Sequence, residues 1–226
     1  MPASTYSKFN AGVSSDNIEY KDRFYHQALL LVMEGYNILI KNENDYSNEE
    51  EPHITGEIVR CARLYIEAPD SPAWVCHYTV HDDPPENDGQ RKGKHRKRVD
   101  IIFEHTQQGE HPRIRFEAKR LKNPDFLVEK YIGEEGLCEF LEGNYAQNDS
   151  VAGMLGYAQS DNCDYWYIQI PEKLKSNKLQ ILLKDKDFWQ KPDFKNIEHC
   201  YKTWHNRKNN LPEILIYHLL LDFTHV

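Results

Sequence analysis

Apolar residues in the first part of the chain recur every three to four positions, which is the spacing of a buried helix face. In 16–41 this series runs through Phe24, Ala28, Leu31 and Gly35, so the pattern predicts a long helix. After a polar break, the spacing returns over 54–68. The inward residues of this second predicted helix, with Thr55 expected as its N-cap, are Ile54, Ile58, Cys61, Ala62 and Tyr65.

Strand-like segments follow the two helices. Residues 73–81 are rich in β-branched and aromatic side chains, and residues 98–120 alternate in twos on either side of a polar turn. Between them lies a long hydrophilic loop with two prolines and a glycine. The pattern therefore predicts a strand, a loop and a two-stranded hairpin.

The second half of the chain is less regular. We expect partial helix after the hairpin, a short helix at 150–160 and an apolar strand at 163–170. The apolar segment at 211–224 fits either a final strand or a buried helix. From residue 54 the order is helix, three strands, helix and strand, which predicts an α/β fold with a mixed central sheet flanked by helices.

Bulk properties add limits to this picture. A chain of 226 residues suits one domain, 1–226, which we expect to have a core at about 54–170 and extensions at both ends. No run approaches 18 apolar residues, and the start lacks a basic region followed by an apolar one, so we expect no membrane span and a cytoplasmic protein. The five cysteines are scattered without a Cys-x-x-Cys pair, which favours reduced thiols.

Charge is unevenly distributed along the chain. The net charge of -8 argues against nonspecific coating of nucleic acid, but 91–98 is strongly basic and 42–51 is acidic. The basic run fits either a solvated loop or a loop that contacts phosphate.

The predicted hairpin carries the candidate chemistry. Alternation places Ile114, Phe116 and Ala118 on one face of its second strand, and Glu117 and Lys119 on the other face with Arg113 and Arg115. Asp100, on the neighbouring strand, can project to the same side as Glu117. Two such carboxylates repel unless a cation lies between them, and Mg²⁺ prefers carboxylate oxygens. A lysine two residues after Glu117 can orient a water molecule or stabilise developing charge.

The same residues also fit a hairpin that faces water, with cross-strand ion pairs and no chemistry. The order of elements distinguishes the two interpretations. The predicted order of elements resembles that of the PD-(D/E)xK nuclease superfamily, the restriction-endonuclease-like fold, over about 54–170. The order is helix, strand, strand with Asp100, strand with Glu117-Ala118-Lys119, helix and strand. Val99 stands where that family usually has proline, and the Gln-x-x-x-Tyr motif of its RecB-like branch is not recognisable.

The resemblance implies a Mg²⁺-dependent endonuclease acting on DNA, with Mn²⁺ as a substitute ion. Asp100, Glu117 and the backbone carbonyl of Ala118 would hold the metal, Lys119 would steer the water, and Glu57 would be the helix acid that many members carry. We expect the residues that contact nucleic acid to be Arg91, Lys92, Lys94, Arg96, Lys97, Arg98, Arg113, Arg115 and Arg120.

The resemblance also implies a setting. Cutting both strands needs two sites, so we expect a homodimer or larger complex, with a role in bacterial restriction or antiviral defence and a helicase or sensor ATPase as partner. Two alternatives stay open: a non-catalytic nuclease-fold scaffold, and a nuclease acting on RNA. The segment 203–210 holds His205-Asn206 beside basic residues, like part of an HNH site, but lacks the other ligands at a suitable spacing.

Overall fold

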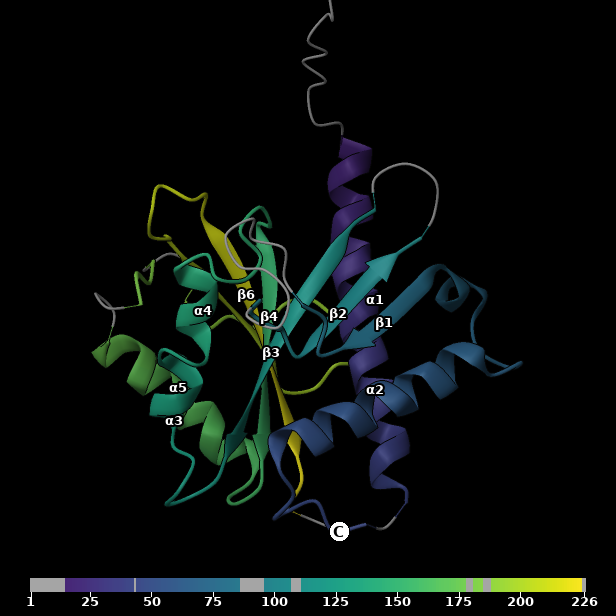
Figure 1. Cartoon of the computed structure of the whole chain (residues 1–226), viewed down its shortest axis with the longest axis horizontal. Helices are drawn as coiled ribbons and strands as arrows, with labels where there is room; N and C mark the ends of the chain where they lie inside the picture. Colours follow the sequence, from purple (N-terminus) through teal and green to yellow (C-terminus); the bar gives the residue numbers. More distant parts are fainter. Residues whose placement is uncertain are drawn as a thin grey trace, which may run out of the picture.

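A computed structural model describes residues 15–42, 44–85, 96–106, 111–177, 181–184 and 188–224 of the chain. In these ranges six strands form one mixed sheet in the order β1-β2-β3-β4-β6-β5 (Figure 1). The strands are β1 (Tyr78–Asp82), β2 (Ile101–His105), β3 (Arg113–Leu121), β4 (Val151–Ala158), β5 (Cys200–His205) and β6 (Ile214–Asp222). Strands β3, β4 and β6 run parallel, whereas β1–β2, β2–β3 and β5–β6 pair antiparallel. The α/β class with a mixed sheet is confirmed.

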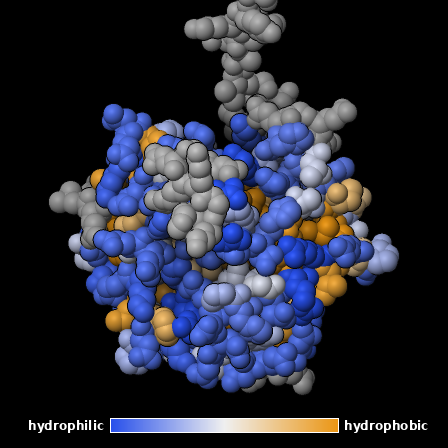
Figure 2. Space-filling model, in the orientation of Figure 1, coloured by the Kyte–Doolittle hydropathy of each residue, from blue (hydrophilic) through white to orange (hydrophobic). Residues whose placement is uncertain are grey.

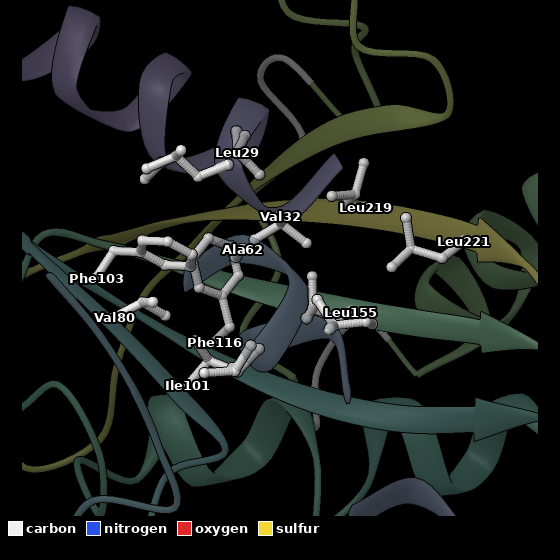
Figure 3. Close-up of a cluster of buried hydrophobic side chains, with 14 of the residues drawn as sticks. Leu29, Val32, Ala62, Val80, Ile101, Phe103, Phe116, Leu155, Leu219 and Leu221 are labelled. Carbon is white, nitrogen blue, oxygen red and sulfur yellow. The ribbon is translucent and has the colours of Figure 1, made fainter. Parts of the chain in front are cut away.

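Helices cover both faces of the sheet (Figure 1). The helices are α1 (Ser15–Ile40), α2 (Glu51–Glu67), α3 (Val128–Ile132), α4 (Leu137–Leu141) and α5 (Cys163–Ser176). Side chains of α1 and α2 share one buried apolar cluster with the sheet, and α3, α4 and α5 share another with its opposite face. Figure 3 shows the first cluster, in which Leu29 and Val32 of α1 face Phe103, Phe116 and Leu155 of the sheet.

The N-terminal predictions are largely confirmed. The long helix expected at 16–41 is α1, and the helix expected at 54–68 is α2, which begins three residues earlier at Glu51. Thr55 is not an N-cap, because it lies inside α2, where its Oγ1 is 2.9 Å from the Tyr157 hydroxyl. The segment at 73–81 is a strand only from Tyr78, since Ala73–His77 forms a short 3₁₀ helix, η1.

Two predictions in the second half are wrong and are effectively exchanged. Residues 150–160 were expected to be helical, but they hold β4, whose eight residues are all buried. A parallel strand buried on both faces is continuously apolar, so it lacks the alternation that marks exposed strands. Residues 163–170 were expected to be a strand, but they belong to α5.

The sequence does contain the signals of α5. Asn162 accepts a hydrogen bond from the Tyr165 N–H at 3.0 Å, which is an N-cap contact. The buried residues of the helix recur at the three- to four-residue spacing of a helix face: Cys163, Trp166, Ile170 and Leu174.

The C-terminal segment is part of the sheet rather than an extension of the predicted core. Strand β6, which resolves the choice left open at 211–224, lies between β4 and β5. The five cysteines carry no disulfide bond. Among the described residues, none of the helices combines the length and hydrophobicity needed to cross a membrane.

The packing of β4 gives a prediction about stability. A Cβ atom at Gly153 would lie 2.1 Å from Cδ1 of Phe116 on β3, whereas a Cβ atom at Gly56 in α2 would meet nothing within 4 Å. Gly153→Ala is expected to destabilise the protein by about 1–3 kcal/mol through overpacking. Gly56→Ala, the matched control, is expected to stabilise it by about 0.5–1 kcal/mol. Urea unfolding measures both, and a Gly153→Ala variant as stable as wild type would contradict the packing described.

Candidate active site

Asp100 and Glu117 come together where β2 begins beside the middle of β3. The antiparallel register pairs Ile101 with Phe116, so Asp100, one residue before β2, lies beside Glu117. The Ala118 N–H donates to Asp100 Oδ2 at 2.6 Å and fixes this carboxylate. The Glu117 side chain is 6% exposed. A hairpin with its charged side chains in water is therefore not what the chain forms.

Lys119 stands beside these carboxylates. Its Nζ donates to Glu117 Oε1 at 2.8 Å and to the Ala118 carbonyl at 2.7 Å. A third partner is Glu51 Oε1 at 3.0 Å. Because the lysine side chain is 13% exposed, its ammonium is held mainly by these groups rather than by water.

Burial and like charge shape the protonation of this cluster. Burial raises the pKa of Asp100 to about 6, against the opposing effect of Lys119. The pKa of Glu117 is also raised, first by burial and then by Asp100. For Lys119, burial lowers the pKa, but Glu117, Glu51 and Asp100 together outweigh it, so the pKa is raised and the ammonium is retained. The cluster thus disfavours two bare carboxylates and favours a cation beside them.

The helix acid that reaches this cluster is Glu51, not Glu57. Glu51 is the first residue of α2, and its Oε2 also accepts the Arg120 N–H at 3.2 Å. Glu57 instead forms an ion pair with Arg60 at 2.8 Å, which lowers its pKa. Glu51 and Glu57 are six residues apart on the helix, which amounts to about 9 Å and more than one and a half turns. Their side chains therefore cannot both reach the same cluster.

A short strap, defined here as residues 46–49, leads into Glu51 and is held by side chains from two strand ends. Gln159, after β4, donates through Nε2 to the carbonyls of Tyr46 at 2.7 Å and Glu49 at 2.8 Å. Lys122, after β3, donates to the Ser47 carbonyl at 3.0 Å. The sequence pattern assigns no role to Glu51 or Gln159, because their partners lie more than 60 residues away in sequence.

The donor set fits a hard divalent cation. Glu117 Oε2 is buried and has no hydrogen-bond partner among the described groups. Asp100, Glu117 and the Ala118 carbonyl offer oxygen ligands, and Mg²⁺ uses one or two carboxylates while keeping waters and substrate oxygens. No group of three His, Cys, Asp or Glu side chains suited to a metal occurs elsewhere in the described ranges or here. The carboxylate and carbonyl oxygens are the ligand type that Mg²⁺ takes, whereas zinc sites are built mainly from Cys and His ligands.

The predicted phosphate-binding residues are mostly engaged with other groups. Arg115 is buried and paired with Asp149, and Arg113 lies 3.8 Å from the same carboxylate. Lys97 pairs with Glu139, and Arg98 with Asp83 at 2.6 Å. Arg120 lies over the Phe126 ring at 3.6 Å. Arg96 is half-buried, and Arg91, Lys92 and Lys94 lie outside the described residues.

His205, the residue that suggested a fragment of an HNH site, is buried in a chain of hydrogen bonds. Its Nδ1 lies 2.8 Å from the Ile181 carbonyl and must donate, so neutral Nε2 accepts from the Thr203 hydroxyl. Thr203 Oγ1 then accepts from His218 Nε2 at 2.7 Å, and His218 Nδ1 accepts from the Tyr131 hydroxyl at 3.0 Å. This satisfied, neutral chain is structural and offers no nucleophile.

The buried histidines predict a loss of stability in acid. Burial lowers the pKa of His205 to about 4 and that of His218 well below its usual value. Below about pH 6.5 the unfolded chain binds protons at these histidines that the folded chain does not bind. The free energy of unfolding therefore falls by up to about 1.4 kcal/mol per pH unit for each histidine.

Urea unfolding between pH 7.5 and pH 4.5 measures this effect. His205→Gln, which cannot titrate, is expected to lose less stability than wild type over this range, whereas a variant of the exposed His81, His81→Gln, should follow wild type. Equal pH dependence in all three proteins would be inconsistent with a buried neutral His205.

Comparison with protein-family models, with curated proteins and with solved structures found no match to this chain.

Proposed function

We propose that this protein is a Mg²⁺-dependent nuclease that hydrolyses phosphodiester bonds of DNA. The observation that carries the proposal is the pair of neighbouring carboxylates, half-buried Asp100 and buried Glu117, with the Lys119 ammonium hydrogen-bonded to Glu117. A hairpin needs no buried like charges for stability, and burying them is costly. Perturbed carboxylates with a specific charge partner are typical of functional sites.

The order of elements supports the same proposal. Helix α2, the antiparallel strands β1, β2 and β3, the short helices α3 and α4, and the parallel strand β4 follow one another in the chain. The sequence resemblance to the PD-(D/E)xK superfamily rests on a helix at 150–160 and a strand at 163–170, whereas in the structure α3 and α4 supply the helix of that order and β4 supplies its last strand. Asp100 precedes its second strand and Glu117-Ala118-Lys119 lies on its third.

Each residue has a definite part in the proposed reaction. Asp100, Glu117 and the Ala118 carbonyl would hold Mg²⁺, which when bound supplies Lewis-acid stabilisation of the charge developing on the phosphate. Lys119 donates hydrogen bonds from Nζ, so it can orient the attacking water or a phosphate oxygen. Glu51 limits the positions that this ammonium can take, because it binds Lys119 Nζ and the backbone N–H of Arg120 together.

Substrate and partners follow from the resemblance and the charge pattern. The basic run at 91–98 and the arginines of β3 are proposed to contact phosphates, although Arg115 must first leave Asp149. The acidic remainder of the chain favours recruitment by a partner over nonspecific coating of DNA. We therefore propose a homodimer or larger complex in bacterial restriction or anti-phage defence.

The testing experiment uses purified protein with plasmid DNA, single-stranded DNA and RNA, each with Mg²⁺ or with EDTA. Wild type is expected to cleave DNA with Mg²⁺ only, and Lys119→Ala to be inactive. Cleavage that survives both EDTA and Lys119→Ala would refute the proposed site. Cleavage of RNA alone would support the same active site with RNA as its substrate. If none of the three substrates is cleaved, a non-catalytic scaffold would be favoured.

A further inference from the structure

A cavity lies at the far end of β2, away from the carboxylate cluster. It has a volume of about 420 Å³ and is formed between α1, η1 and the ends of β1 and β2. His105, which lines it, is five residues beyond Asp100, a separation of roughly 17 Å along a strand. The lining of the cavity includes Tyr20, Arg23, Gln27, Trp74, His77 and His105.

The wall of this cavity is aromatic and fixed in place. The Tyr78 ring meets Trp74 edge-on at 5.6 Å and His105 at 4.9 Å. Tyr20 meets His105 edge-on at 5.7 Å, and its hydroxyl is 3.0 Å from His105 Nδ1. The Tyr78 hydroxyl donates to Gln27 Oε1 at 2.7 Å. Because these rings hold one another in place, they form a preorganised surface on which a flat ligand can stack.

The cavity lining combines a cationic side chain with two histidine rings. Arg23 lies at its rim, His77 and His105 lie 5.5 Å apart between ring centroids, and its lining includes no aspartate or glutamate among the described residues. Burial first, and then the neighbouring His77, His111 and Arg23, lower the pKa of His105. Because Gln27 accepts from Tyr78 through Oε1, its amide nitrogen is the group left to bind another acceptor.

The face shown in Figure 2 is mostly hydrophilic, with apolar side chains gathered mainly over the side on which α2 and β1 lie in Figure 1. A cavity of similar volume, about 440 Å³, lies between the segment 123–129 and α5, but it is lined by Glu129 and Glu172 as well as Lys173. The combination of aromatic rings with the Arg23 guanidinium and no acid among the described lining residues thus distinguishes the cavity beside η1.

We infer that the cavity beside η1 binds a nucleotide, as a flat aromatic base carrying a negatively charged phosphate. The base would lie against Trp74 and His77, because bases stack on aromatic rings whatever their sequence. The phosphate would pair with the Arg23 guanidinium, which matches its geometry. The shared chemistry fits a free nucleotide or the terminal nucleotide of a strand, and the inference does not depend on nuclease activity.

Calorimetric titration of the full chain in EDTA tests this inference. The probes are AMP, adenosine, ribose 5-phosphate and a short 5′-phosphorylated oligonucleotide. AMP is expected to bind, and Trp74→Ala and Arg23→Gln are each expected to weaken it at least about 10-fold. Trp74→Phe should restore most of the affinity, and Tyr165→Ala, which alters the other cavity, should leave it unchanged.

The outcomes separate as follows. Tighter binding of the oligonucleotide than of AMP would identify a strand end, and the reverse a free nucleotide; either supports the site. Binding of ribose 5-phosphate or adenosine as tight as that of AMP would overturn the inferred ligand. No binding of AMP at millimolar concentration, or equal weakening by Tyr165→Ala and Trp74→Ala, would overturn the site.

Discussion

Replacing Glu117 by glutamine is expected to lower Mg²⁺-dependent DNA cleavage by about 1,000-fold or more. The substitution keeps the shape of the side chain but removes the charge that would hold the metal, and several kcal/mol of transition-state stabilisation depend on that ion. Single-turnover cleavage of a labelled duplex measures the loss. The fold should survive, because Lys119 keeps Glu51 and the Ala118 carbonyl as partners.

A matched control exists in the same chain. Glu139 in α4 is also a buried glutamate with a lysine partner, Lys97, and an oxygen, Oε2, without a hydrogen-bond partner. Glu139→Gln removes a buried charge without touching Asp100 or Lys119, so cleavage should remain. Equal activity of Glu117→Gln and wild type would exclude Glu117 as a metal ligand.

Replacing Glu51 by glutamine is expected to reduce cleavage by roughly 10–100-fold, the usual effect of removing a group that orients catalytic residues. Its carboxylate binds Lys119 Nζ at 3.0 Å and the Arg120 N–H, so the amide would loosen the lysine. Because Glu51 acts through Lys119, its loss should affect kcat more than KM.

Glu57→Gln is the control for Glu51→Gln, since both lie on α2 and only Glu51 contacts Lys119. Wild-type cleavage by Glu57→Gln and reduced kcat in Glu51→Gln are expected. Reduced kcat in Glu57→Gln with wild-type cleavage by Glu51→Gln would favour Glu57, the residue that the sequence suggested, and would contradict the role given to Glu51.

Local patterns identified the part of the site that lies within one hairpin. Alternation along β3 separates buried Phe116 and Ala118 from Glu117 and Lys119, and antiparallel pairing brings Asp100 beside Glu117. The sequence did not point to Glu51, because its partners are set by how α2 packs on the sheet, through contacts such as that of Thr55 with Tyr157. The sequence pattern starts the predicted helix at residue 54, so it places Glu57, but not Glu51, on that helix.

The same limit explains the errors in the second half of the fold. Strand β4 lies between β3 and β6 and is covered by helices on both faces. Its residues are therefore apolar on both faces and lack the alternation of polar and apolar positions that marks an exposed strand. Its glycines, at 153 and 156, allow Phe116 and Leu220 to approach the strand closely. The apolar character of 163–170 predicted a strand, although the buried residues of α5 follow helical spacing.

The most direct test of the central claim is calorimetric titration of the purified protein with Mn²⁺ and Mg²⁺, which needs neither substrate nor partner. Wild type and Glu57→Gln are expected to bind one ion per chain, and Asp100→Asn and Glu117→Gln to lose that binding. Absence of binding by wild type, or binding that survives in both Asp100→Asn and Glu117→Gln, would contradict a metal site formed by these carboxylates.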